Sequence, residues 1–400
     1  MATHTTPYEA VVVGAGPAGI TCVGNLLARK LQPILWVDDG FDGGRINRMY
    51  REVPSNTKVR LFMDWGTGVD PLKTIATDAG DKLGFMRELD QNKGTRLSNA
   101  ADMALVLTEG LKTTPGVETK YGRVSSAVLN EGADPSWHVH LDNTFMATTS
   151  SETSTVFTKR LVFCTGSSPN NSPLPVRIPN IRNLDLDTAL SPSKLRAALA
   201  SEKSLTISVI GASHSAILVL MNLYGLAASS KPDLRIRWFT RHALRYAKEM
   251  DGWILRDNTG LKGDAATWAQ NNLEPKVFDK SDVSKYMERI EYPAGDEEGV
   301  FEERIPGSQY YVQAIGYSRD PLPELTTASG ESITPEFDHE KGCFHYARGE
   351  GASESARVPG LFGAGIAFPE RVKDPHGNVE MAVGFMKFMK FVRKVVNDWN

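Results

Sequence analysis

Short apolar runs followed by longer helical patterns occur twice along the chain. Residues 11–13 (VVV) and 204–211 (SLTISVIG) have the composition of buried strands, and a turn of small residues follows each of them. A helical pattern then leads to a second apolar run, at 33–37 after the first turn and at 234–241 after the second. Two strand–turn–helix–strand units predict an α/β protein with two Rossmann-like dinucleotide-binding domains.

The first turn has the spacing of a dinucleotide site. Its residues are Gly14, Gly16, Pro17, Ala18 and Gly19, which fit G-x-G-x-x-G ahead of a helix expected over 20–31. Gly14 permits the tight turn, Gly16 lets a pyrophosphate approach the backbone, and Gly19 lets the helix pack on the strand. Asp38, with Asp39 after it, stands where an acid accepts a hydrogen bond from a ribose hydroxyl. The alternative is a glycine-rich packing turn, which the surrounding pattern disfavours.

The second turn, VIGASHSAI at 209–217, admits two chemical interpretations. A nucleophile elbow needs G-x-S-x-G, and serine stands here in place of the last glycine. A phosphate cradle formed by Gly211, Ser213, His214 and Ser215 fits better, and a plain packing turn is the third alternative. Arg241 ends the next strand where NAD sites carry an acid, so it is expected to bind the 2′-phosphate of NADPH, helped by His242 or Arg245.

Other segments are predicted less sharply. The alternating stretches from 117 to 166 predict a β-meander, and residues 376–399 predict a core helix with a basic solvated face. Residues 242–305, which carry Trp253 and Trp268, form either a substrate lid or a solvated insertion.

Composition narrows the class of protein. The 400 residues carry a formal net charge of −3, with 41% apolar and 23% charged residues, which indicates a soluble globular protein and no nucleic-acid partner. No apolar window is long enough for a membrane span, and no secretory signal is evident, so a cytoplasmic location is expected. Three separated cysteines exclude a C-x-x-C dithiol, and the histidines form no metal cluster, so no metal is expected.

Two segments resemble a known family. GAGPAG followed by DDGFDGGR resembles the FAD-binding opening of two-dinucleotide flavoproteins, and residues 49–65 resemble flavin-containing and N-hydroxylating monooxygenases. The resemblance implies that Gly44 and Arg45 run toward the flavin and that Asn56 is a catalytic polar group beside it. The alternative for Asn56 is a simple turn.

Further cofactor contacts follow from the resemblance. Thr165 and Gly166 match the element where the chain passes the cofactor, and the backbone near Val124 would contact adenine. Residues 358–370 resemble the closing FAD motif, in which many relatives have aspartate after the second glycine. Here Ile366 follows Gly365, so the ribityl contact falls to other groups. The final helix, with Val379 near its start, would point its N-terminus at the flavin.

The resemblance also implies the domain order and the reaction. Residues 1–170 and 326–400 would form the FAD domain, and 171–325 the inserted NADPH domain. NADPH would reduce FAD, and the reduced flavin would react with oxygen to a C4a-hydroperoxide that oxygenates nitrogen, sulfur or a ketone in a small molecule. An NAD(P)H-dependent reductase or oxidase is the alternative, since the F-x-G-x-x-x-H segment is missing. A hydrolase, a structural flavoprotein and a homodimer also stay open.

Overall fold

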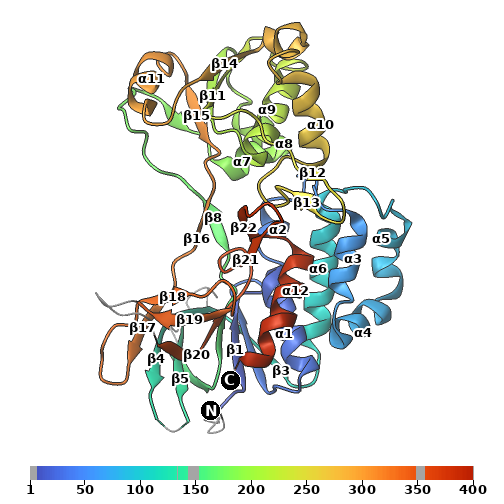
Figure 1. Cartoon of the computed structure of the whole chain (residues 1–400), viewed down its shortest axis with the longest axis vertical. Coiled ribbons are helices and arrows are strands. Elements are labelled where there is room, and N and C mark those ends of the chain that lie inside the picture. The colour runs from blue at the N-terminus through green and yellow to red at the C-terminus, as the bar shows by residue number, and fades with distance from the viewer. Residues whose placement is uncertain (1–6, 133, 143–152, 348–355, 400) are drawn as a thin grey trace.

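The molecule consists of two bodies (Figure 1). Two chain segments that run side by side connect them. The computed structural model describes residues 7–132, 134–142, 153–347 and 356–399. The larger body contains a seven-stranded sheet and the smaller body a five-stranded sheet. Chain segments from both ends of the sequence build the larger body, and the middle of the chain builds the smaller one.

The seven-stranded sheet has the order β18-β19-β20-β7-β1-β2-β3, and its central strands are parallel. The strands are β1 (Ala10–Val13), β2 (Ile34–Asp38), β3 (Val117–Tyr121), β7 (Leu161–Phe163), β18 (Pro335–Phe337), β19 (Cys343–Tyr346) and β20 (Arg357–Gly363). Alternate residues of β1 face opposite sides: Val12 belongs to the core under the helices, and Val11 to the core under a second sheet. Both faces are therefore buried, which accounts for the continuous apolar runs.

Helices cover one face of this sheet (Figure 1). They are α1 (Pro17–Ala28), α2 (Arg45–Arg48), α3 (Val59–Gly66), α4 (Asp70–Asp78), α5 (Gly84–Glu88), α6 (Leu97–Lys112) and α12 (Phe385–Val395), with the 3₁₀ turns Gly80–Leu83 and Val396–Asp398. The first helix begins at Pro17, earlier than expected, because Gly16 has extended backbone and proline suits the first helical turn. It ends at Ala28, and Lys30 then has a φ of 59°.

The predicted meander is correct only in part. β4 (Arg123–Asn130), β5 (Ser136–Asp142) and β6 (Thr153–Thr158) pair antiparallel and cover the other face, with β17 (Glu324–Thr327) added to β4. β3 and β7, however, join the parallel sheet. Alternation along the chain fixes which face is buried and leaves the pairing partner open. Most of the serine- and threonine-rich stretch at 148–155 lies outside the described residues.

The smaller body is a parallel sheet in the order β14-β11-β10-β15-β9. Its strands are β9 (Arg182–Asn183), β10 (Leu205–Ile210), β11 (Leu234–Thr240), β14 (Met287–Glu291) and β15 (Tyr310–Gln313). Its helices are α7 (Leu186–Leu190), α8 (Pro192–Ala198), α9 (His214–Ala227), α10 (Gly263–Asn272) and α11 (Glu297–Arg304), with the 3₁₀ turns Phe278–Lys280 and Asp282–Lys285. The core on one face contains α9, and α11 packs on the other.

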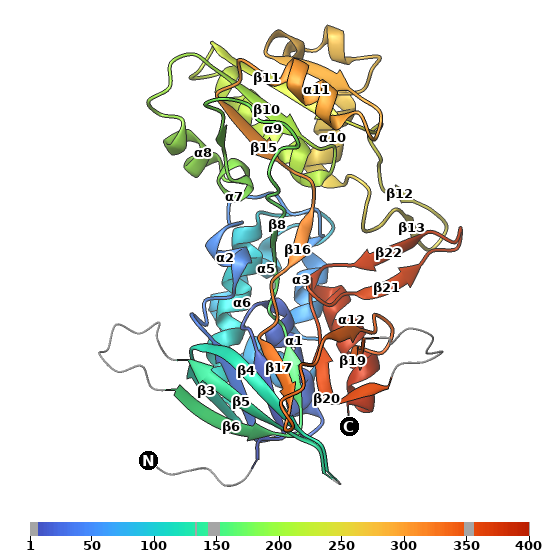
Figure 2. The same ribbon diagram turned by 90° about the vertical axis from the view of Figure 1, so that its left-hand side faces the viewer.

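β8 (Ser167–Pro169) and β16 (Tyr317–Arg319) pair antiparallel and carry the chain out to the smaller body and back (Figure 2). A second link comes from residues 257–262 of the predicted insertion. Asp257 contacts Lys387 at 2.7 Å, and the backbone N–H of Asn258 donates to Glu380 at 3.0 Å. The insertion is therefore docked on the larger body, through the loop that follows the hairpin of β12 (Lys248–Glu249) and β13 (Ile254–Leu255).

The final predicted helix is wrong in its first part. Residues 376–384 do not belong to it: β22 (Val379–Ala382) pairs with β21 (Glu370–Lys373), and the helix begins at Phe385. Val379 lies on β22 with 57% of its surface exposed, so it is not at the start of that helix. The apolar spacing at 379–383 is compatible with a strand as well as with a helix. The hydrogen bonds that Glu380 accepts from Asn258 and Thr259 of the insertion favour the strand.

A buried indole supports each glycine turn in the same way. Trp36 Nε1 donates to the carbonyl of Gly14 at 2.9 Å, and Trp238 Nε1 donates to the carbonyl of Gly211 at 2.8 Å. Both tryptophans are fully buried and lie on the second strand of their unit. The two turns are thus built alike, although their sequences differ.

Trp238→Phe tests this support. The substitution keeps an aromatic ring but leaves the Gly211 carbonyl without its buried donor, so the free energy of unfolding is expected to fall by about 1–3 kcal/mol in urea denaturation. Trp268→Phe is the control, because Trp268 packs beside Tyr224, away from the turn. A loss no larger than that of the control would contradict the prediction.

Candidate active site

The first glycine turn is shaped so that side chains cannot fill it. Gly14 has a φ of 107°, and a Cβ there would lie 2.4 Å from the carbonyl oxygen of Cys164. A Cβ on Gly19 would lie 1.8 Å from the Gly14 oxygen. Gly16 caps α1 without a side-chain hydrogen bond, so the first N–H groups of the helix are free to bind phosphate.

The predicted ribose acids hold the loop after β2. Asp38 accepts hydrogen bonds from the backbone N–H groups of Ala15 (2.7 Å), Gly40 (2.8 Å) and Phe41 (2.7 Å). Asp39 pairs with Arg48 and Arg123, at 3.2 and 2.9 Å. Asp38 therefore fixes the turn against the end of β2, and its contact with a ribose stays a prediction.

Arg45 belongs to a polar network that joins both bodies. Its guanidinium pairs with Asp187 on α7, and the Tyr50 hydroxyl donates to the same carboxylate at 2.8 Å. The hydroxyls of Tyr50 and Tyr317 are 3.4 Å apart, and Ser215 is hydrogen-bonded to Tyr317. The network thus runs from the first site, through the crossing strand β16, to the second site.

Burial and charge set the protonation of this network. Burial opposes the charge on Arg45, but Tyr50 and Asp187 outweigh it and raise the pKa of the guanidinium. Burial also raises the pKa of Tyr50 well above its ordinary value, and the neighbouring Tyr317 adds to this. Arg45 is therefore charged and Tyr50 neutral around pH 7. Asp187 escaped sequence reasoning because it is 142 positions from Arg45 and belongs to no local motif.

The second turn repeats the geometry of the first. Gly211 has a φ of 130°, and a Cβ there would lie 2.4 Å from the carbonyl oxygen of Ala314. The Ser213 hydroxyl donates to that same oxygen at 3.3 Å. His214 begins α9, and burial lowers its pKa to about 4, assisted by the positive charge of Lys262. His214 is thus a neutral ring at the helix N-terminus.

Arg241, the predicted 2′-phosphate ligand, already has an acidic partner. It contacts Glu297 on α11 at 3.0 Å, and both side chains are partly exposed. Because the pair lies at the carboxyl end of β11, a phosphate at this edge would compete with Glu297 for the guanidinium.

Several polar atoms along the two turns are buried without a protein partner in the described chain. They are Nε of Arg45, Oγ1 of Thr165 and Nδ1 of His214. Buried groups of this kind are normally hydrogen-bonded, so unpartnered ones in a cradle indicate a missing ligand. The residues therefore fit a dinucleotide at each turn.

For the remaining predicted residues, the structure gives a position but no feature that indicates a bound cofactor. Asn56 is exposed and lies beside Gly263 of the smaller body, in a turn where Ser55 accepts from the N–H of Thr57. Val124 lies near the start of β4, next to the end of β3. Gly166, with a φ of 86°, precedes β8. The contacts of these residues with a cofactor stay predictions.

A cavity of about 830 Å³ opens beside the closing motif. Ile366 lines it, together with Ser167 and Tyr317 of the crossing strands and Phe337 of β18. The sequence shows Ile366 only as a departure from the motif, because the cavity walls come from five segments that are far apart in the chain.

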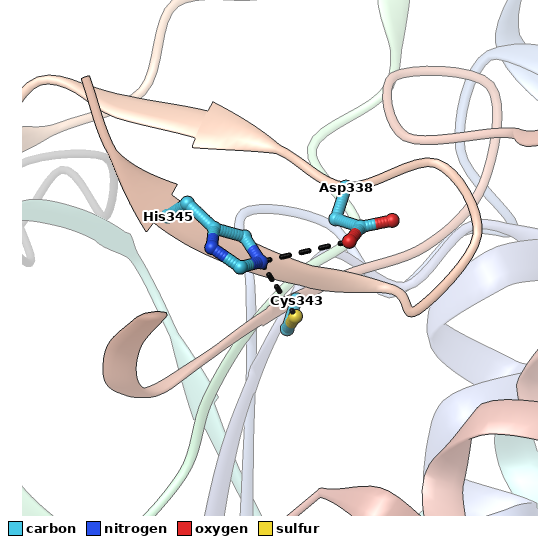
Figure 3. Close-up of side chains that lie close together, drawn as sticks. All are labelled: Asp338, Cys343 and His345. Atoms are coloured by element: carbon cyan, nitrogen blue, oxygen red, sulfur yellow. Dashed lines mark hydrogen bonds and ion pairs between the residues drawn. The ribbon is translucent and has the colours of Figure 1, made fainter. Parts of the chain in front are cut away.

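The hairpin of β18 and β19 brings together three side chains that sequence analysis left apart (Figure 3). Nε2 of His345 lies 3.5 Å from Asp338 Oδ2 and 3.7 Å from Cys343 Sγ. Asp338 also accepts from the N–H groups of Glu340 and Lys341, and the Lys341 ammonium is 4.0 Å away. This cluster holds donor atoms that metals use, and in the present arrangement it braces the hairpin turn.

Cys22 stands in an apolar helical pattern and Cys164 in an apolar strand pattern, which predicts that both are buried core residues, and the structure confirms this. Cys22, Cys164 and Cys343 are buried, and the sulfurs of Cys22 and Cys164 are 3.6 Å apart. Burial raises the pKa of Cys22, and the neighbouring Cys164 adds to this. Among the described helices, none combines the length and apolarity that crossing a bilayer requires.

The fold and its two glycine turns define a protein of the two-dinucleotide-binding class, and solved structures agree. The ornithine N-hydroxylase KtzI of Kutzneria sp. 744, in a structure with FADred, NADP+ and L-orn, superposes with a TM-score of 0.61 at 13% identity, covering 98% of this chain and 99% of that one. The ornithine hydroxylase PvdA of Pseudomonas aeruginosa gives 0.59 at 12% identity, with 98% and 99% covered. The predicted fold class is confirmed.

Sequence comparison shows the family. No protein-family model matches. The chain is 48% identical over 394 residues to "Monooxygenase AgnR1" of Paecilomyces divaricatus, covering 98% of this chain and 97% of that protein. The chain therefore belongs to the family of this monooxygenase, and the predictions of an enzyme and of a monooxygenase relative are confirmed.

Asp187→Asn tests the network between the bodies. The change removes the negative charge opposite Arg45 and adds an N–H₂ donor, so the free energy of unfolding is expected to fall by about 1–3 kcal/mol. Tyr50→Phe removes only a hydrogen bond and should cost less. Chemical denaturation of both variants measures this, and equal losses would argue against a charge-based link.

His214 predicts a pH dependence of stability. Its folded pKa of about 4 lies below the ordinary value of 6.5, so the unfolded state binds more protons between these values. The contribution of neutral His214 to the free energy of unfolding is fully present above pH 6.5 and is lost as the pH falls toward 4. At about 1.4 kcal/mol per pKa unit, the loss amounts to up to about 3 kcal/mol. His214→Gln should flatten the curve of unfolding free energy in this window. An unchanged slope would contradict the prediction.

Proposed function

We propose that the chain is an FAD- and NADPH-dependent monooxygenase that acts on a small organic molecule with molecular oxygen as co-substrate. The observation that carries the proposal is the pair of equivalent glycine turns, each with unpartnered buried polar atoms, in a member of a monooxygenase family. We assign residues 1–170 and 326–400 to FAD and 171–325 to NADPH.

The larger body supplies the groups for FAD. The free N–H groups after Gly16 would bind the pyrophosphate, and Nε of Arg45 and Oγ1 of Thr165 would find partners on the same molecule. With FAD held by these groups, the site would have the chemistry for accepting hydride from NADPH and for activating oxygen. The protein holds the cofactor in place and keeps its Arg45 oriented through Asp187.

The smaller body supplies the groups for NADPH. The N-terminus of α9, with neutral His214 at its first position, faces the second turn, and Arg241 would bind the 2′-phosphate after release from Glu297. His242 or Arg245 would assist Arg241 in binding this phosphate. The crossing strands connect this site to the first one. A homodimer and a cytoplasmic location stay predictions.

The experiment that tests the function is anaerobic addition of NADPH to the FAD-loaded protein, followed by oxygen. Loss of flavin absorbance with NADPH, and later oxygen consumption that exceeds peroxide release once a substrate is present, would support a monooxygenase. Reduction followed by stoichiometric peroxide with every substrate would favour the reductase or oxidase. No reduction by NADPH would overturn the proposal.

Arg241→Ala is expected to weaken NADPH binding by about 10- to 100-fold, the range of a lost charge-assisted contact, and to leave NADH binding unchanged. Glu297→Gln should strengthen NADPH binding, since it removes the carboxylate that pairs with the Arg241 guanidinium. Flavin reduction rates at varied NADPH and NADH concentrations measure both. Equal effects on NADPH and NADH would show that Arg241 does not bind the 2′-phosphate.

A further inference from the structure

The cluster of Asp338, Cys343 and His345 combines three kinds of metal ligand in one hairpin (Figure 3). Asp338 directly follows β18, and Cys343 and His345 lie two positions apart on β19. Alternate residues of a strand point to the same face, which places the thiol and the imidazole side by side. The pairing of β19 with β20 is irregular between Cys343 and His345, and irregularities of this kind re-aim side chains next to functional sites.

Both neighbours of the imidazole approach the same ring nitrogen. Asp338 Oδ2 is 3.5 Å and Cys343 Sγ is 3.7 Å from Nε2 of His345. A ring nitrogen has one N–H or one lone pair, so it can form a good hydrogen bond with only one of these two atoms. The arrangement also differs from a nucleophilic triad, which turns one ring nitrogen toward the acid and the other toward the nucleophile.

The separations match those between ligands of one zinc ion. Zinc binds nitrogen and oxygen at about 2.1 Å and thiolate sulfur at about 2.3 Å, so tetrahedral ligands lie about 3.4 Å (N to O) and about 3.6 Å (N to S) apart. The observed values are 3.5 and 3.7 Å, and all three ligand atoms lie within 4.8 Å of one another. Small rotations of the side chains therefore suffice to bring the three atoms onto one ion.

The backbone of the hairpin turn holds the ligands in place. The N–H of Asp338 donates to the carbonyl of Cys343, and the N–H of Gly342 donates to the carbonyl of Asp338, both at 2.9 Å. Oδ1 of Asp338 accepts from the N–H groups of Glu340 and Lys341, which leaves Oδ2 turned toward the imidazole. Carboxylates that bind metals are commonly oriented by such additional hydrogen bonds.

Two cations lie near the cluster. The ammonium of Lys341 is 4.0 Å from Asp338, but its side chain is 72% exposed, so it can turn into solvent. Arg357 stands opposite His345 in the pairing of β19 with β20, and its guanidinium donates to the carbonyl of Asp398 at 2.9 Å. Neither side chain is therefore required as the partner of the cluster.

Charge and access favour a divalent ion with affinity for sulfur. A thiolate and a carboxylate carry two negative charges, which balance those of Zn²⁺, whereas Ca²⁺ and Mg²⁺ take oxygen ligands. Cys343 is buried, but the side chains of Asp338 and His345 are 23% and 22% exposed. The ion would thus enter from solvent and keep a water molecule as its fourth ligand.

We propose that Asp338, Cys343 and His345 form a binding site for one Zn²⁺ ion, with Oδ2, the thiolate sulfur and Nε2 as its ligands. When the ion binds, the Cys343 thiol gives its proton to water. The sequence predicts no metal because its histidines form no cluster, and this site needs only one histidine. None of the three residues is in the described lining of the cavity beside Ile366 or in either glycine turn, so the ion would link the β18–β19 hairpin.

Titration of the full-length protein with Co²⁺ and Zn²⁺ after treatment with a chelator tests this. Co²⁺ is the spectroscopic probe, because tetrahedral Co²⁺ absorbs at longer wavelengths than flavin and a bound thiolate adds a charge-transfer band in the near ultraviolet. One equivalent of Co²⁺ is expected to give both features in difference spectra. Zn²⁺ is expected to displace it and to raise the Tm of the protein.

Substitutions of the three ligands locate the ion. His345→Gln and Asp338→Asn should each weaken Zn²⁺ binding by more than about 100-fold, since even the loss of an outer partner costs about 10- to 100-fold. Cys343→Ser should also lose the charge-transfer band. The controls are Glu340→Gln, a carboxylate of the same turn, and Cys22→Ala, a buried thiol elsewhere, and both should bind Zn²⁺ as the unsubstituted protein does.

Several outcomes would overturn the proposal. They are no Co²⁺ spectrum, a spectrum without the thiolate band, equal Zn²⁺ affinity of His345→Gln and the unsubstituted protein, and loss of binding in Cys22→Ala. Circular dichroism of the same samples tests whether each variant is folded. If Cys343→Ser does not fold, the spectrum of the unsubstituted protein and the affinity of His345→Gln decide, since neither depends on that variant.

Discussion

A hydrogen bond from a buried indole to the carbonyl of a turn glycine is the constraint on which both nucleotide sites depend. Trp36 and Trp238 each point from the second strand of a unit to Gly14 or Gly211. The bond satisfies a carbonyl that the strained turn would otherwise bury unpaired, and it holds the turn so close to the third strand that no Cβ fits. The following helix then presents its free N–H groups to a phosphate in both bodies.

Two charge pairs help to determine how the two sites face each other. On one side, Asp187 of the smaller body pairs with Arg45 beside the first site. On the other, Asp257 of the insertion pairs with Lys387 of α12. Both ion pairs add to the connection that β8 and β16 make between the bodies. Two connecting strands alone would allow the bodies to rotate relative to each other. Ser191 and Ser193 of the smaller body also donate to Glu52, and Val53 packs in the core of the smaller body. Together these contacts hold the two sites in an arrangement that hydride transfer between two cofactors would need.

Low sequence identity to the solved structures shows how much of this design is independent of particular residues. An identity of 13% accompanies a TM-score of 0.61, because the same fold can be built with different side chains.

The sequence by itself determined the features that depend on neighbouring residues: the glycine turns, the buried strands, and the burial of Cys22 and Cys164. Local periodicity and φ requirements are sufficient for these. Only the tertiary structure decided that Val379 lies on a hairpin, that Glu297 forms an ion pair with Arg241, and that Asp187 forms one with Arg45. Each of these depends on residues far apart in the chain, whose meeting follows from strand order and from the crossing between the bodies, and neither property leaves a local pattern.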